Sequence, residues 1–152
     1  INAEKEAENI NTFDELRDYR KKNTHSLIMA AHPFYPSFSC LGKRFLRNID
    51  LFDAIEYCHY HCPGINIFNN KAVRKAKKHT LPMLGTSDAH KFLHFNTTYT
   101  LVDSEKTIKG VVDALKKGNV IVKTKPLSYS SCLKVIFPIM RNKLKCFLEK
   151  FK

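Results

Sequence analysis

The sequence predicts an α/β domain in which short strands alternate with helices and run parallel to one another. Strand-like segments at 27–31, 53–58 and 81–85 are separated by segments whose apolar residues have helical spacing. The run at 27–31 does not alternate with polar residues, as expected for a strand that is covered on both faces. Strand–helix–strand order is typical of parallel α/β architecture. In such folds, functional side chains collect in the loops after the carboxyl ends of the strands.

Local signals place the first two helices. Thr12 and Glu15 have the spacing of a capping box, so a helix is expected over about residues 13–22. Its acidic residues come first and its basic residues last, which suits the helix dipole. A second, short helix is expected at about 41–48, after a loop that Ser and Pro residues interrupt.

The second half of the chain continues the alternation. Asn69 or Asn70 is expected to cap a helix that follows the 53–58 strand. Ser104 is expected to cap a later helix, and Gly118 to end it in a left-handed conformation. Two further strands are expected at 98–102 and 119–123.

The C-terminal residues 128–152 differ from the rest of the chain. Apolar residues recur there at helical spacing, with Lys and Arg between them, which predicts a basic amphipathic helix. One interpretation is a helix that packs on the barrel or sheet. The other is a cationic helix that lies on an anionic membrane surface.

The composition limits the class of protein. The 152 residues are 43% hydrophobic and 26% charged, which is typical of a globular domain. The sequence has no run of about 18 apolar residues and no secretory signal pattern, so we expect a cytoplasmic protein. Five cysteines without regular spacing favour free thiols in a reducing compartment. Because the first residue is Ile, we expect a fragment or a processed chain.

The charge is unevenly distributed along the chain. Residues 1–31 carry five basic and six acidic side chains, whereas the remainder carries 21 basic and eight acidic ones. This excess favours polyanionic partners, namely phosphorylated substrates, nucleic acid or an anionic membrane surface. The alternative is a Lys-rich surface that only keeps the domain soluble.

Two strand ends carry candidate metal ligands. Asp88 and His90 follow the 81–85 strand, and His32 follows the 27–31 strand. A carboxylate oxygen together with neutral imidazole nitrogens suits Zn, Mn or Fe. An Asp-x-His pair alone also fits an ordinary polar turn. His32 has the equivalent position after another strand, and this coincidence favours the metal hypothesis.

Two other segments offer weaker candidates. Lys91 and His94 could contact a phosphate or protonate a leaving group, although the alternative is a pair of exposed loop residues. The residues Cys58-His59-Tyr60-His61-Cys62 have zinc-ligand types. Closed zinc sites usually draw ligands from two separate loops, so a buried Cys58 at a strand end is the favoured interpretation.

Five motifs in order resemble the PHP (polymerase and histidinol phosphatase) superfamily across roughly residues 12–127. They are Ala31-His32-Pro33-Phe34, Asp53-Ala54-Ile55-Glu56, Asn69-Asn70-Lys71-Ala72, Gly85-Thr86-Ser87-Asp88-Ala89-His90 and Tyr99-Thr100. The resemblance implies the C-terminal portion of a distorted (β/α)7 TIM-like barrel over residues 1–127. It further implies metal-dependent hydrolysis of phosphate esters at two or three Zn, Mn or Fe ions.

By this resemblance, His32, Asp88 and His90 are metal ligands, with Asp88 and His90 at the catalytic centre. Glu56 lies near the pocket, where the family often has a Glu. The family's other ligands come from an N-terminal half that opens with His-x-His, and nothing in this sequence matches that half. The expected partners are therefore a phosphorylated small molecule or nucleotide and the missing half of the domain. The alternative is a non-catalytic remnant or basic binding module for nucleic acid or an anionic membrane surface.

Overall fold

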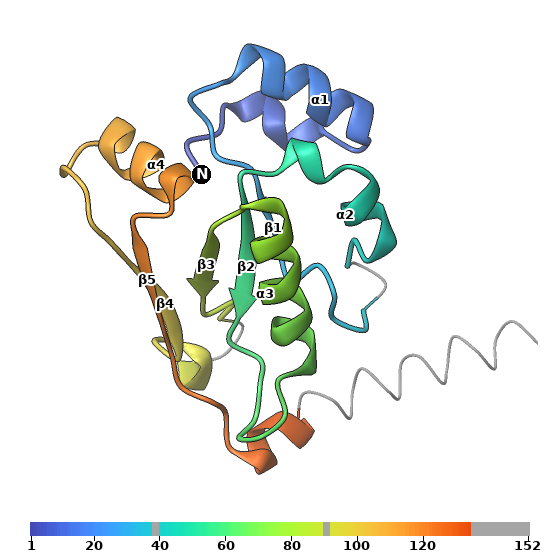
Figure 1. Cartoon of the computed structure of the whole chain (residues 1–152), viewed down its shortest axis with the longest axis vertical. Helices are drawn as coiled ribbons and strands as arrows, with labels where there is room; N and C mark the ends of the chain where they lie inside the picture. The colour runs from blue at the N-terminus through green and yellow to red at the C-terminus, as the bar shows by residue number, and fades with distance from the viewer. Residues whose placement is uncertain (38–39, 90–91, 135–152) are drawn as a thin grey trace, which may run out of the picture.

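The structure is a computed structural model that describes residues 1–37, 40–89 and 92–134 (Figure 1). Its elements are η1 (Lys5–Asn9), α1 (Phe13–Lys22), β1 (Met29–Ala30), α2 (Lys43–Arg47), η2 (Ile49–Leu51), β2 (Ala54–Cys58), α3 (Ile67–His79), β3 (Met83–Thr86), η3 (Phe92–His94), β4 (Thr98–Val102), α4 (Ile108–Lys117) and β5 (Val120–Thr124). Within the described residues, no helix is long and apolar enough to cross a membrane.

The strands form two small sheets. Strands β1, β2 and β3 are parallel and lie in that order, with Ala30 opposite Ile55 and Cys58 opposite Thr86. Strands β4 and β5 form an antiparallel pair. The α/β class is confirmed, whereas the described strands do not show a closed barrel. The expectation of parallel strands fails for β4 and β5, because strand–helix–strand order does not by itself fix the direction of the returning strand.

Apolar side chains cover both faces of the parallel sheet. Ile55 of β2 packs with Ala72 and Ala76 of α3, and the aromatic residues around α2 complete this cluster. Its neighbour Ala54 points to the other face and packs with Leu115 of α4. In Figure 1, α3 lies across one face of the sheet, and α4 lies beside the β4–β5 pair. The carboxyl ends of β1, β2 and β3 therefore open at one edge between two covered faces.

Gly85 allows the β4–β5 pair to approach β3 closely. A Cβ atom at this position would lie 2.7 Å from Val122 Cγ1 and 3.1 Å from the Tyr99 carbonyl oxygen. Thr100 binds both backbone polar atoms of Gly85, at 2.8 Å to the amide nitrogen and 2.9 Å to the carbonyl oxygen. These contacts hold the strand that precedes Asp88 against the second sheet.

Several sequence-based boundaries are confirmed and others shift. The Thr12–Glu15 capping box is present, and Gly118 ends α4 with φ +79°. Thr107, not Ser104, caps α4 through its side chain. Asn66 precedes α3, so the prediction that Asn69 or Asn70 caps this helix is wrong. Asn69 instead lies buried inside α3, for the reason given below.

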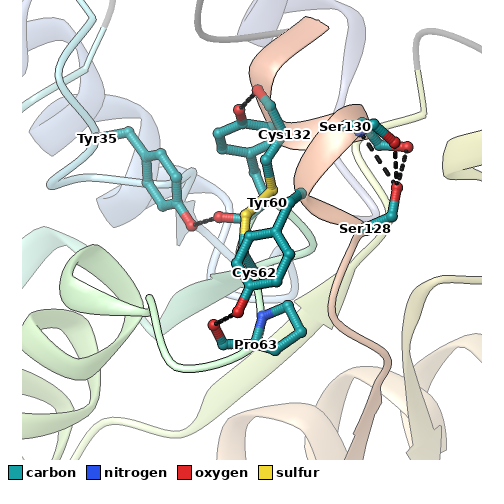
Figure 2. Close-up of a disulfide and its surroundings, with 9 residues drawn as sticks. Tyr35, Tyr60, Cys62, Pro63, Ser128, Ser130 and Cys132 are labelled. Atoms are coloured by element: carbon teal, nitrogen blue, oxygen red, sulfur yellow. Dashed lines mark hydrogen bonds between the residues drawn. A yellow bond between two sulfur atoms is a disulfide. The ribbon is translucent and has the colours of Figure 1, made fainter.

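A disulfide joins Cys62, in the loop after β2, to Cys132 in the C-terminal segment (Figure 2). Backbone and side-chain contacts support the same junction. Leu127 N donates to the His61 carbonyl at 2.8 Å, and the Tyr129 hydroxyl donates to the Pro63 carbonyl at 3.0 Å. The expectation of free thiols is wrong for this pair, because the two cysteines are 70 residues apart and only the fold brings them together. Cys40 and Cys58 form no disulfide.

The described tail is thus attached to the body of the protein at the β2–α3 loop. Residues 129–134 are helical, and they fall at the start of the segment 128–152 for which a helix is predicted. The rest of that prediction, residues 135–152, lies outside the described residues.

Removal of the disulfide should destabilise the protein. Cys132→Ser frees a loop of about 70 residues, and loss of such a crosslink typically lowers the free energy of unfolding by about 2–4 kcal/mol. Urea unfolding of the variant measures the effect, with Ser130→Ala in the same helical turn as the control. Equal unfolding midpoints for the Cys132→Ser variant and the unmutated protein would contradict this assignment.

Candidate metal centre

Four potential metal-binding side chains lie at the carboxyl edge of the parallel sheet. His32 follows β1, Cys58 ends β2, His59 comes next in the chain, and Asp88 follows β3. Because the three strands are parallel and adjacent, their ends bring these residues to one place.

His32 and Asp88 meet across this edge, although β1 and β3 are separated by β2. His32 Nε2 lies 3.9 Å from Asp88 Oδ2. Both residues have positive φ angles, 26° for His32 and 40° for Asp88, in a region that side-chain-bearing residues rarely adopt. Such strain clusters at functional sites, where the surrounding structure enforces it. The geometry thus brings together two of the three ligands that the sequence predicts.

Cys58 and His59 add a second group of donors around the same carboxylate. One ligand atom each from Cys58, His59 and Asp88 lies within 4.8 Å of the other two. Cys58 Sγ is 3.8 Å from His59 Nδ1. Side chains of consecutive strand residues normally point to opposite faces, but His59 lies in a bend immediately after β2. The bend lets both side chains turn toward Asp88.

Both carboxylate oxygens of Glu56 are used in hydrogen bonds that connect the ends of the strands. Its Oε2 accepts a hydrogen bond from the His32 backbone amide, and its Oε1 accepts one from the Thr86 hydroxyl. The side chain therefore ties the end of β1 to the end of β3 through the central strand. Burial raises the pKa of Glu56, whereas these two hydrogen bonds act in the opposite direction. Glu56 thus contacts His32, and its place beside a substrate pocket stays a prediction.

The backbone of Cys58 is fixed from α3. Asn69 is 1% exposed, its Oδ1 accepts from Cys58 N at 3.0 Å, and its Nδ2 donates to Cys58 O at 2.8 Å. Burial raises the pKa of the Cys58 thiol to about 12, although the Tyr60 amide and Tyr35 hydroxyl lower it. Asn69 is buried within α3 because it satisfies the last residue of β2, and so it cannot cap the helix.

His94 contributes a buried imidazole next to His59. The two rings are 5.0 Å apart between centroids, and His94 is only 5% exposed. Its Nδ1 is buried without a hydrogen-bond partner among the described residues. The alternative of an exposed loop residue is therefore wrong for His94. That His94 lines a substrate pocket stays a prediction.

The cysteine–histidine stretch after β2 divides into two parts. Cys58 and His59 face Asp88, whereas His61 Nε2 lies 2.9 Å from Thr124 Oγ1 and Cys62 is in the disulfide. Burial lowers the pKa of His61. The prediction that these residues do not share one closed zinc site agrees with this division, and Cys58 is buried as expected. His90 and Lys91, the other sequence candidates, lie outside the described residues.

The donor set fits a divalent cation of borderline softness. Imidazole nitrogens, a carboxylate and a sulfur within a few ångströms match the ligands that zinc takes in proteins. Manganese prefers oxygen-rich surroundings, which a site containing Cys58 offers less well. A metal at this edge is thus compatible with the residues present.

The sequence did not identify Cys58 and His59 as partners of Asp88. The available signal was their place at the end of the 53–58 strand, equivalent to the places of His32 and Asp88 in their own segments. The closely spaced Cys-His-Tyr-His-Cys pattern drew attention away from this signal. The pattern suggested one local zinc site instead of a site that is shared between strands.

Loss of the Asn69 contacts should destabilise the end of β2. Asn69→Leu leaves the Cys58 amide and carbonyl buried without their partners, so the free energy of unfolding should fall by about 2–4 kcal/mol. Urea denaturation measures this change. Asn70→Leu, at the exposed neighbouring position, is the matched control and should change stability by about 0.5 kcal/mol or less. Equal effects of the two substitutions would refute the role of Asn69.

Comparison with known families supports the resemblance seen in the sequence. A PHP-associated family model matches residues 66–120, which include α3, β3, β4 and α4. A search of curated proteins found no match. The matched segment includes Asp88 and Asn69, whereas His32, Cys58 and His59 precede it. Residues 66–120 are therefore similar to the PHP-associated family, in agreement with the C-terminal PHP resemblance of the sequence.

Proposed function

We propose that this chain forms part of a metal-dependent phosphoesterase of the PHP type, which hydrolyses a phosphate ester with a metal-activated water. The observation that carries the proposal is the approach of His32 Nε2 to Asp88 Oδ2, 3.9 Å apart at the ends of β1 and β3. The match of residues 66–120 to the PHP-associated family adds support.

The side chains of the chain have separate roles in this proposal. A bound divalent cation would supply Lewis-acid stabilisation of the phosphoryl oxygens and a water of lowered pKa. His32 and Asp88, with His90, would hold the cation, and Asp88 would contribute negative charge that partly balances it. Glu56 orients the His32 backbone through its hydrogen bond, so it positions a ligand without being one. His94 is proposed to contact a phosphate oxygen or the leaving group.

The surrounding architecture is proposed to be a distorted (β/α)7 barrel of which β1–β3 form one part. Three adjacent parallel strands with helix α3 packed on one face are compatible with such a barrel. In the family, further ligands come from a His-x-His half that residues 1–152 do not match. We propose that half as the partner that completes a site with two or three Zn, Mn or Fe ions.

The proposed substrate is a phosphorylated small molecule or a nucleotide. Beyond residue 31 the chain carries 21 basic and eight acidic side chains, which favours an anionic substrate. The same excess supports the second candidate function, a non-catalytic module that binds nucleic acid or an anionic membrane. Binding to such a polyanion should weaken steeply as salt rises, whereas metal retention should not.

Substitution of Asp88 should weaken metal binding. Asp88→Asn removes the charge that meets His32 and the Cys58–His59 pair, so zinc affinity should fall at least about tenfold, as even outer-sphere changes do. Equilibrium dialysis followed by elemental analysis measures affinity. Release of phosphate from an aryl phosphate ester, by the chain together with the proposed partner half, measures activity.

The matched control is Asp113→Asn, which breaks an exposed ion pair with Lys109 on α4. This variant should keep the metal affinity and the hydrolysis rate of the unmutated chain. The proposal fails if Asp88→Asn keeps both quantities as well.

A further inference from the structure

The candidate site contains a sulfur donor that the phosphoesterase proposal does not use. Cys58 and His59 are 2% and 4% exposed, and both lie next to Asp88. The ligands proposed above are imidazoles and a carboxylate, which do not strongly distinguish zinc from manganese or iron. A cysteine in the same place changes this selectivity.

The sulfur is held in position before any cation binds. Asn69 fixes both backbone polar atoms of Cys58, so the end of β2 cannot easily rotate away from Asp88. Sγ, a His59 ring nitrogen and an Asp88 oxygen lie within 4.8 Å of one another. Ligands about 2.0–2.3 Å from a common zinc ion lie roughly 3–4 Å apart, so small side-chain rotations suffice. A preformed group of ligands loses little conformational entropy when it binds a cation.

We propose that Cys58 and His59 bind one divalent cation together with Asp88, and that the Cys58 thiolate makes this site selective for zinc over manganese. The inference rests on the proposed function, since it assigns further ligands to the same centre. On binding, the S–H bond breaks, its electron pair goes to the metal–sulfur bond, and the proton passes to solvent. No oxidant or reductant is needed.

A second buried thiol supplies the alternative assignment. Cys40 Sγ lies 3.2 Å from His32 Nδ1, so it contacts the ring nitrogen opposite the one that faces Asp88. In that place Cys40 orients the imidazole instead of joining the donor group around Asp88. The two thiols therefore differ in their expected response to metal.

Cobalt is the probe that distinguishes the two thiols, because Co²⁺ replaces zinc and gives a near-ultraviolet charge-transfer band when a thiolate binds it. The titration uses the full chain with Cys146→Ser and the Cys62–Cys132 disulfide intact, so that Cys40 and Cys58 are its thiols. The band should appear in this background and in Cys40→Ser. It should disappear in Cys58→Ser, with a fall of at least about tenfold in zinc affinity and little change in manganese affinity.

Two results would overturn the inference. One is a charge-transfer band that persists in Cys58→Ser, and the other is a band that is lost in Cys40→Ser alone. If Cys58→Ser does not fold, zinc X-ray absorption of the unmutated chain gives the answer. A sulfur scatterer at about 2.3 Å supports the proposal, and a first shell of nitrogen and oxygen alone rejects it.

The outcome is separable from that of the phosphoesterase proposal. If the metal has a sulfur ligand but aryl phosphate hydrolysis does not depend on Asp88, this inference is supported and the proposed function is rejected. If hydrolysis depends on Asp88 but the metal has no sulfur ligand, the proposed function is supported and this inference is rejected.

Discussion

The parallel alignment of β1, β2 and β3 is the constraint on which the candidate site depends. Each strand alone ends in one or two polar residues, and only their alignment brings His32, Cys58 and Asp88 to one edge. Glu56 fixes that alignment at the ends themselves, because its two oxygens bind the His32 amide and the Thr86 hydroxyl. A buried carboxylate is costly unless its oxygens are hydrogen-bonded, so these two contacts explain how Glu56 is accommodated in the centre of the sheet.

The packing around the sheet supports the same edge from both faces. On one face Asn69 of α3 binds the backbone of Cys58. On the other, Gly85 lets the β4–β5 pair close on β3, and Thr100 binds its backbone. The disulfide adds a third attachment, since Cys62 lies four residues beyond Cys58 and anchors the loop to the C-terminal segment (Figure 2). Rigid support of this kind is what a metal centre requires of its surroundings.

The sequence predicted the local features well and the long-range ones poorly. The capping box at Thr12 and the terminal Gly118 depend on neighbouring residues, so their patterns are sufficient. His32 and Asp88 were identified because strand ends can be recognised locally, although their metal-binding role stays a prediction. The Cys62–Cys132 bond and the antiparallel β4–β5 pair depend on contacts between distant segments. The position of Cys58 and His59 beside Asp88 likewise follows from the strand register, which composition does not reveal.

Crystals of the full chain grown with zinc would test the central claim most directly, through anomalous diffraction at the zinc absorption edge. The account requires an anomalous peak at the carboxyl edge of β1–β3, within about 2.0–2.3 Å of donor atoms from Asp88 and at least one of His32, Cys58 and His59. A peak elsewhere on the molecule, with that edge empty at saturating zinc, would contradict it.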